Sequence, residues 1–427
     1  MMLTPIAAGF GTVTAGALMV YGLYATVKSR FLPLRGFCAM FRQIRTPQQT
    51  GRTVSPFRAF ATSLAGTIGV GNLTGVSLAI ALGGPGAVFW MWISALVCMT
   101  VKYFEVYLAM KHQPKDETHY GFAPMEYLKK ATESKGFAGL FSLFGLFSAL
   151  IMGSMIQTNA AANAVKQTFS CSPWIIGILF SVGAGVFLIG GIKGITGIME
   201  KAVPLLGGVF LLIGLLVISL RYDRILPAFQ SIFQQAFSFS SAAGGFLGSG
   251  MALAFRHGVG NGLFSHEAGL GSAGLAHGAC GADPEKQGLW GMFEVFADTM
   301  IISTVSAFMI LTTDVTGNSE GVLLATERVL GTVGSWMICG CLILFAFLSV
   351  LSWGCYGETC FVWLCGKKSA VVFRLLFTAT PLLAILSPEQ TLWKSAEIIN
   401  GMMMILNLTG LLGYRKELKT LSALKFK

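Results

Sequence analysis

Two long apolar segments are each interrupted by glycine, and this pattern limits the folds open to the chain more than any other feature. The first, AGTIGVGNLTG, runs from Ala65 to Gly75, and the second, GVGNGLFSHEAGLGSAG, runs from Gly258 to Gly274. A helix inside lipid must satisfy its own backbone hydrogen bonds, whereas glycine at this density favours unwinding. Unwound backbone at membrane depth is tolerated only where it is buried in protein or lines a cavity. Two such segments in corresponding halves of one chain are typical of the binding site of a secondary transporter.

Composition supports an integral membrane protein. Of the 427 residues, 54% are hydrophobic and only 11% are charged, whereas an average soluble domain has roughly 25% charged residues. The net charge of +11 does not indicate nucleic-acid binding, because the basic residues gather in alternate loops without interleaved aromatic residues. The nine cysteines are scattered, odd in number and without a CxxC pair, which predicts reduced, buried thiols and argues against a metal site.

The apolar runs predict an all-α polytopic protein, with one membrane domain over residues 1–427. Eleven spans are expected, at about 20 residues each. Their predicted ranges are 6–27, 57–82, 86–110, 138–168, 173–192, 201–220, 241–279, 287–312, 333–362, 370–387 and 390–413. The first run is long for a signal sequence and precedes a basic stretch, so we expect a retained extra N-terminal helix.

The remaining ten spans divide into two halves of five, residues 57–220 and 241–413, followed by a tail at 414–427. An odd number of spans in each half forces the halves into opposite topology, which predicts a 5+5 inverted repeat. Basic residues are dense in the loop after the first span, in the loop after the third span and in the tail. The positive-inside rule therefore predicts a cytoplasmic (inner) membrane protein with its N-terminus outside and its C-terminus cytoplasmic.

The first break offers ends of two half-helices at the bilayer midplane. The N–H groups after Asn72 suit a carboxylate, while the bare carbonyls of the preceding half-helix suit a small hard cation such as Na⁺. The Asn72 side chain is expected either to bind the ion or to hold the break open. The alternative is a structural role, in which Gly71 and Gly75, four residues apart, allow close packing of helices.

In the second break, Phe264, Ser265, His266 and Glu267 are expected at the start of the inner half-helix. Glu267 is interpreted first as an N-cap of that half-helix, and otherwise as a functional charge. His266 is expected to bind substrate, relay protons or simply bond the backbone.

Polar residues in other spans are further candidates. Gln157 and Asn159 lie in the fourth span, where an amide can reach a ligand or bond a neighbouring helix. In the ninth span, Ser349 is expected to complete a Na⁺ shell or to bond back to its own helix. Lys102 and Glu105, one turn apart, are interpreted as a structural ion pair.

Enzyme classes find little support. HEAGL begins like the zinc-peptidase HExxH, but Leu270 takes the place of the second histidine, and no GxSxG elbow occurs. Broken helices would also suit a channel.

Several motifs resemble those of the alanine or glycine:cation symporter family. These are GTIGVGNLTGVSLAIALGGPGAVFWMW followed by KYFE, FSHEAGLGSAGLAH, MIQTN and SWGCYGE. The resemblance spans nearly the whole chain. It implies a LeuT-like fold with one extra helix, and Na⁺-coupled or in some members H⁺-coupled uptake of alanine or glycine, with no organic cofactor.

The resemblance also implies which residues form the site. Those expected to bind substrate are Thr67, Gly69, Gly71, Asn72, Gln157, Phe264, Ser265, His266 and Trp353. Those expected to bind Na⁺ are Ala65, Ile68, Asn72 and Ser349.

The chain departs from the family pattern at a few positions. His266 stands where Asn is usual, Gly274 replaces Pro, Asn261 replaces Arg, and Leu348 stands where Ser is expected beside Ser349. The ion shell is therefore largely retained, while His266 leaves open proton coupling, exchange, or a related substrate such as serine or D-alanine.

Overall fold

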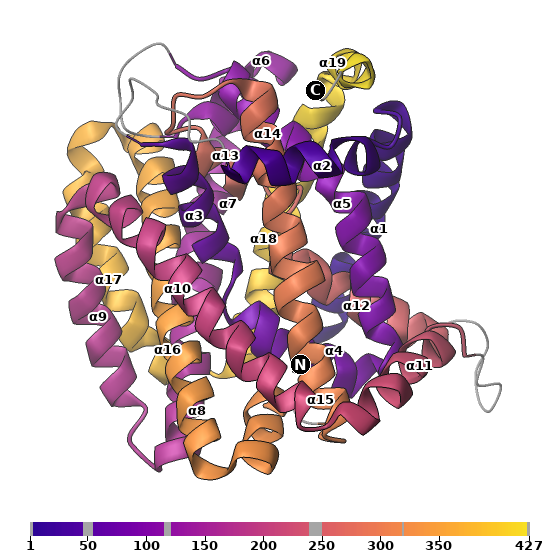
Figure 1. Ribbon diagram of the computed structural model, residues 1–427. Coiled ribbons are helices and arrows are strands. Elements are labelled where there is room, and N and C mark those ends of the chain that lie inside the picture. The colour runs from indigo at the N-terminus through magenta and orange to yellow at the C-terminus, as the bar shows by residue number, and fades with distance from the viewer. Residues whose placement is uncertain (1–2, 46–53, 115–120, 239–249, 318–319, 425–427) are drawn as a thin grey trace.

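A computed structural model describes residues 3–45, 54–114, 121–238, 250–317 and 320–424. Nearly all of this described part is helical (Figure 1). Two expected features fall partly outside it, namely residues 241–249 of the predicted seventh span and the end of the C-terminal tail.

The chain begins with a long apolar helix and a short basic one, and then forms the first half of the bundle. The helices up to the midpoint are α1 (Leu3–Lys28), α2 (Leu32–Arg45), α3 (Pro56–Thr67), α4 (Val76–Gly83), α5 (Gly86–Lys111), α6 (Ala123–Thr132), α7 (Lys135–Ser148), α8 (Gln157–Phe169), α9 (Trp174–Ile189) and α10 (Gly191–Ser219). Two π-helical segments, η1 (Gly71–Gly75) and η2 (Ala149–Ile156), lead directly into α4 and α8. A π-helical insertion inside a helix is often found at a functional site.

The second half follows a surface helix, α11 (Ile225–Ala236). Its elements are α12 (Gly250–His266), α13 (Ser272–His277), α14 (Pro284–Val295), the π-helical η5 (Phe296–Ser303), α15 (Thr304–Thr312), α16 (Gly321–Cys365), α17 (Ala370–Leu386) and α18 (Glu389–Gly413). The short helix α19 (Arg415–Thr420) follows α18.

Most boundaries agree with the predicted ones to within a few residues, with two exceptions. α10 begins at Gly191 instead of residue 201, and α16 begins at Gly321 instead of residue 333. In both cases charged residues in the first turns, such as Lys201 and Glu327, interrupt the apolar run without interrupting the helix. α16 is kinked at Gly331, whose φ of 66° and ψ of −160° are not helical.

Eight helices among the described residues are long and apolar enough to cross a membrane. The pair formed by residues 56–67 and 71–83, bent by 48°, makes a ninth. The 16-residue α9 and the broken pair α12 and α13 correspond to the two other predicted spans, but each is shorter than a full crossing helix. The count of eleven spans therefore stays a prediction.

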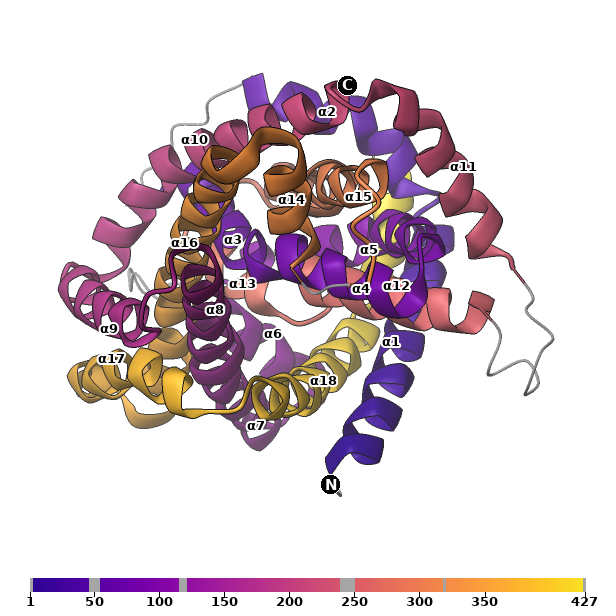
Figure 2. The ribbon, with the colours of Figure 1, turned by 90° about the horizontal axis from the view of Figure 1, so that it is seen from below.

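The broken helices lie in the middle of the bundle. Seen from below, α3, α4, α12 and α13 are central, whereas α1, α9, α17 and α18 are peripheral (Figure 2). Helices in the same position of each predicted half pack on one another, α5 on α14 and α9 on α17. Two halves built alike would give this pairing, but the division of the chain into two halves stays a prediction.

The outer helices present an apolar surface. Leu179 and Val186 on α9, Leu212 on α10 and Leu375 on α17 are each more than half exposed. In water such a surface would be unstable, but it is what lipid requires of a spanning helix.

Candidate functional site

The first break is held open by an asparagine. α3 is capped by Ser55, whose hydroxyl accepts the Arg58 N–H, and it ends at Thr67, whose hydroxyl donates back to the Leu64 carbonyl at 3.1 Å. The chain is then extended at Ile68 before η1 begins. The Asn72 side-chain oxygen accepts the Gly69 N–H at 3.1 Å across this gap. Of the two roles predicted for Asn72, this bond fits that of holding the break open.

The second break lies later than predicted. Gly258 and Gly262 are helical within α12, and the chain unwinds only at residues 267–271. Glu267, Gly269 and Gly271 have φ values of 52°, 82° and 90°, the left-handed conformation that ends a helix sharply. Phe264, Ser265 and His266 therefore form the last turn of α12, and their predicted place at the start of the inner half-helix is wrong.

Glu267 does not cap α13 as predicted. The residue before that helix is Gly271, which has no side chain to cap the backbone N–H groups of the first turn. The Glu267 carboxylate instead accepts the Ser272 hydroxyl at 2.7 Å and the Trp353 indole N–H at 3.2 Å. Glu267 thus connects the unwound segment to α16, and its carboxylate fixes the buried ring of Trp353 through the indole N–H.

The two breaks meet at a close backbone contact. A Cβ atom on Gly71 would lie 3.2 Å from the Ser265 Cα, so only glycine lets the segments approach this closely. Beside it, a Cβ atom on Gly69 would lie 2.8 Å from both the Gln157 Oε1 and the Ser349 Oγ. Gln157 also accepts the Val70 N–H at 3.3 Å. The structure thus brings together Gly69, Gly71, Gln157, Ser265 and Ser349, as the sequence predicts.

Oxygen atoms gather at the end of α3. The Ser349 hydroxyl donates to the carbonyls of Ala65 at 2.8 Å and Ile68 at 3.3 Å. The Ser349 hydroxyl therefore bonds the broken helix, and the alternative prediction, a bond back to its own helix, is wrong. Two carbonyls and a hydroxyl are ligands that suit a small hard cation. Asn72 lies outside this set, because its side-chain oxygen is on Gly69.

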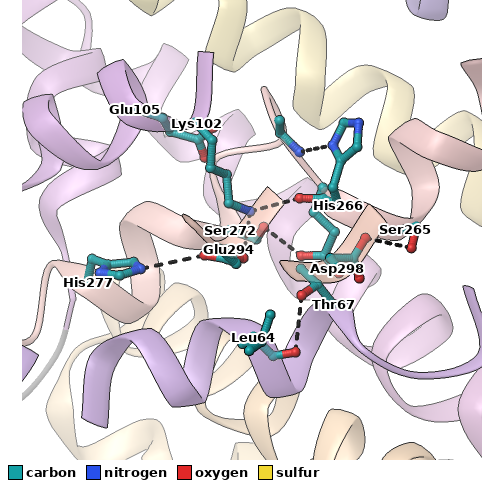
Figure 3. Close-up of polar contacts among 12 residues, drawn as sticks. Leu64, Thr67, Lys102, Glu105, Ser265, His266, Ser272, His277, Glu294 and Asp298 are labelled. Carbon is teal, nitrogen blue, oxygen red and sulfur yellow. Dashed lines mark hydrogen bonds and ion pairs between the residues drawn. The ribbon is translucent and has the colours of Figure 1, made fainter. Parts of the chain in front are cut away.

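Asp298 is a site residue outside the predicted set. It is fully buried in η5, and its carboxylate accepts the Asn72 amide at 2.8 Å and the Thr299 hydroxyl at 2.9 Å. It also accepts the Ser265 hydroxyl at 2.8 Å (Figure 3). None of these partners is basic. An acid inside an apolar span is the signal that singles it out, and its contact with both broken helices gives it a place in the site.

Three polar residues of the site come from π-helical segments. Asn72 lies in η1, Gln157 directly follows η2, and Asp298 lies in η5. The extra residue in each π turn leaves backbone carbonyls available and re-aims the side chains that follow. A π-helical segment in each of three spans therefore helps to direct the side-chain amides of Asn72 and Gln157 and the carboxylate of Asp298 toward one site.

Two other predicted substrate residues lie at the edge of the crossing. The half-buried Phe264 ring lies 4.7 Å from the ring of Trp393 on α18. The His266 Nδ1 accepts the Ala268 N–H at 3.2 Å, which is the backbone role among those predicted for this residue. Asn159 bonds the Ala384 carbonyl of α17, which is the helix-to-helix alternative.

A cluster of buried charges lies on one side of the site. Lys102 pairs with Glu294 at 2.9 Å and donates to the His266 carbonyl at 3.0 Å (Figure 3). The predicted ion pair with Glu105 is wrong, because the described bond of that carboxylate is to the Gly269 N–H at 3.0 Å. The lysine and both glutamates therefore tie α5 to α14 and to the second break.

An open cavity lies on the other side of the site. It is open to solvent, and it reaches Leu73 and Thr74, which follow Asn72 in the chain. Glu320 and Glu389 also line it. Burial raises the pKa of Glu320, although a hydrogen bond from Gln167 opposes this shift.

Comparison with known proteins assigns the family. The model of the sodium:alanine symporter family matches residues 5–423. The chain belongs to this family. The symporter is 37% identical over 374 residues to the sodium/alanine symporter AgcS of Methanococcus maripaludis, covering 84% of this chain and 81% of the relative. It is 33% identical over 400 residues to the probable sodium/glutamine symporter GlnT of Bacillus subtilis, and the match covers 92% of this chain and 83% of the relative.

Solved structures agree with the fold of this symporter. MhsT in complex with L-phenylalanine aligns with a TM-score of 0.60 at 14% identity, covering 89% of this chain and 99% of that structure. An outward-open Na⁺-coupled sialic acid symporter aligns with a TM-score of 0.53, also at 14% identity, and the match covers 99% of this chain and 86% of that structure. The predicted family and its LeuT-like helical fold are confirmed. This member of the family is a multi-pass membrane transporter and not an enzyme.

Proposed function

We propose that this chain couples the entry of Na⁺ to the import of a small neutral amino acid, alanine or glycine, by alternating access. The observation that carries the proposal is the crossing of two broken helices at Gly71 and Ser265. At this crossing the N-terminal end of one half-helix and the C-terminal ends of two others lie close together. Such ends attract the opposite charges of a zwitterion.

The amino acid is proposed to bind between the two breaks. Its carboxylate faces the N-terminal end of η1, and its ammonium group faces the carbonyl end of α12. Gln157 and Phe264 border the space, and Trp353 lies beyond Gly66, whose Cβ would be 3.7 Å from the indole nitrogen. The close approach of Gly71 to the Ser265 backbone, and of Gly69 to the Gln157 and Ser349 side chains, favours an amino acid with a small side chain.

Na⁺ is proposed to bind the carbonyls of Ala65 and Ile68 with the Ser349 hydroxyl, whose mutual distances of 2.8 and 3.3 Å support a compact shell. Na⁺ and a zwitterion together carry one net positive charge. The buried carboxylate of Asp298, whose described partners are neutral, offers the balancing negative charge.

The proposed orientation follows the charges of the loops. Lys129, Lys130 and Arg415 lie at one end of the bundle, which we assign to the cytoplasm. The cavity opens at the opposite end, and the buried Lys102 cluster lies toward the cytoplasmic end. The conformation is therefore outward-facing, and the two five-span halves are proposed to rock about the site.

Uptake by proteoliposomes tests the proposal. We expect labelled alanine to accumulate only when external Na⁺ exceeds internal Na⁺, and not when choline replaces Na⁺. Equal uptake in choline that follows an imposed proton gradient would replace Na⁺ by H⁺ as the coupling ion. Uptake that requires internal amino acid would indicate exchange. Competition by serine and D-alanine, measured in the same vesicles, identifies the substrate; no uptake of any small amino acid would overturn the proposal.

A further inference from the structure

The helix α2 is turned sharply out of the direction of the spans. Arg30 and Phe31, between α1 and α2, both have positive φ values, 55° and 56°. Residues with side chains seldom adopt this conformation, which costs roughly 1–2 kcal/mol each. Their N–H groups are satisfied by the carbonyls of Val27 and Thr26. As a result α2 lies across the upper end of the bundle, nearly at right angles to the spans (Figure 1).

α2 presents three distinct faces. Leu32, Gly36, Met40 and Gln43 are buried against the protein. Leu34, Phe37 and Phe41, spaced by three and four residues, form an exposed apolar edge, with 74%, 38% and 37% of each residue accessible. Arg35, Cys38 and Arg42 form an exposed edge beside it. An apolar edge next to a basic edge is typical of a helix that lies in the interface of a membrane.

The helix is fixed in place on the protein. The rings of Phe37 and Phe41 contact the ring of Phe296 at 5.4 and 5.6 Å, and Phe41 also contacts Phe293 at 5.9 Å. Arg35 donates to the carbonyls of Ser29 and Leu424. These contacts set the orientation of both exposed edges before any ligand arrives, which lowers the cost of binding.

The charge of this segment selects its partner. Residues 28–58 contain seven basic residues and no acidic one. We propose that α2 binds the phosphate headgroups of anionic phospholipids, with Leu34, Phe37 and Phe41 at the level of the upper acyl chains. Each basic residue near an anionic surface adds about 1 kcal/mol of attraction. A second copy of the chain would bring an equally basic face to the same place, which disfavours self-association there.

The test uses the thermal unfolding of the purified full chain in neutral detergent, with phosphatidylglycerol or phosphatidylcholine added. We expect phosphatidylglycerol to raise the unfolding midpoint more than phosphatidylcholine does, since a ligand that binds only the folded state stabilises it. In the variant Arg30→Gln/Arg42→Gln, the concentration of phosphatidylglycerol needed for half of the effect should rise about thirtyfold. This readout does not depend on transport.

A matched control removes the same charge from the opposite end of the bundle. Arg221→Gln/Arg224→Gln changes two exposed or half-exposed arginines near α11, and it should keep the full response to phosphatidylglycerol. Equal stabilisation by the two lipids, or an unchanged response of the α2 variant, would overturn the proposal. Loss of the response in the control would do so too, because the effect would then reflect net charge alone.

Discussion

At the residue scale, the sharpest prediction concerns Ser349. Ser349→Ala removes the hydroxyl that joins the carbonyls of Ala65 and Ile68. A bond to a charged partner contributes about 1.5–3 kcal/mol, so the Na⁺ concentration for half-maximal uptake should rise at least about tenfold. The measurement is the Na⁺ dependence of alanine uptake in proteoliposomes.

Ser352 on the same helix provides the control. It is also fully buried, but among the described residues its hydroxyl has no hydrogen-bond partner. Ser352→Ala should leave the Na⁺ dependence unchanged. If both alanine variants shift it equally, the effect of Ser349 comes from packing in α16 and not from an ion.

Asp298 gives the second prediction. Asp298→Asn keeps the size of the side chain but removes the negative charge. Its one oxygen can still accept the Asn72 amide, whereas its amide nitrogen would have to donate to the Ser265 hydroxyl that donates to the carboxylate in the native chain. If this charge balances Na⁺ beside a zwitterion, the variant should fold and lose at least about tenfold in Na⁺ affinity, because a charged partner is worth more than about 1.4 kcal/mol here. Isothermal titration with Na⁺, in the presence of alanine, measures this; an unaltered affinity would remove Asp298 from the proposed site.

The sequence predicts residue types at the site better than it predicts their partners. Ser349 and Gln157 were expected to reach the break, and both do. Asp298 could not be assigned because its partner Asn72 is 226 residues away, and only the fold brings them together. Lys102 was paired with Glu105 on local spacing, whereas a closer carboxylate, Glu294, comes from another helix.

At the scale of elements, the packing of η2 against α16 can be tested with glycine. A Cβ atom on Gly153 would lie 2.1 Å from the Trp353 Cβ, so Gly153→Ala must push the two spans apart. Overpacking of this kind costs about 1–3 kcal/mol. Gly340→Ala on α16, where a Cβ meets nothing within 4 Å, should be neutral or slightly stabilising. Thermal unfolding in detergent compares the two, and equal midpoints would contradict the packing described.

The buried ion pair that ties α5 to α14 gives a prediction about the loss of a charge, whereas the preceding one concerned added volume. Lys102→Met removes the lysine partner of Glu294 and leaves only His277, at 3.6 Å, beside that carboxylate among the described residues; all three side chains are fully inaccessible. This should lower the free energy of unfolding by about 3–5 kcal/mol, whereas Lys102→Met/Glu294→Gln should recover part of the loss because no bare carboxylate remains. The double-mutant cycle measures the coupling, and additive losses would show that the pair contributes little.

Helix positions follow from apolar runs, but breaks do not follow from glycine alone. Glycines 258 and 262 lie within the helix α12, where they serve packing, because Ala87 and Ser94 on α5 leave no room for a side chain there. The second break instead occurs where the left-handed residues Glu267, Gly269 and Gly271 follow one another. Glycine serves packing in one place and unwinding in the other, and a single sequence does not distinguish the two uses.

For the whole molecule, the position of the cavity defines which end is open. The cavity reaches Thr74 on one side of the first break, while Thr62 on the other side of the same broken span is buried. In an alternating-access transporter only one of these paths is open at a time. The described conformation therefore predicts a difference in reactivity between two threonines of one span.

Thr74→Cys and Thr62→Cys, in a background with Cys38, Cys171 and Cys365 changed to Ser, test this difference. These three are the native thiols that are not buried. A polar thiol reagent in detergent solution should modify Thr74→Cys quickly and Thr62→Cys slowly. Adding Na⁺ with alanine should slow the first reaction, because closing the cavity over the site excludes the reagent. Equal rates at the two positions, or faster labelling at Thr62→Cys, would show that the resting protein opens toward the other end.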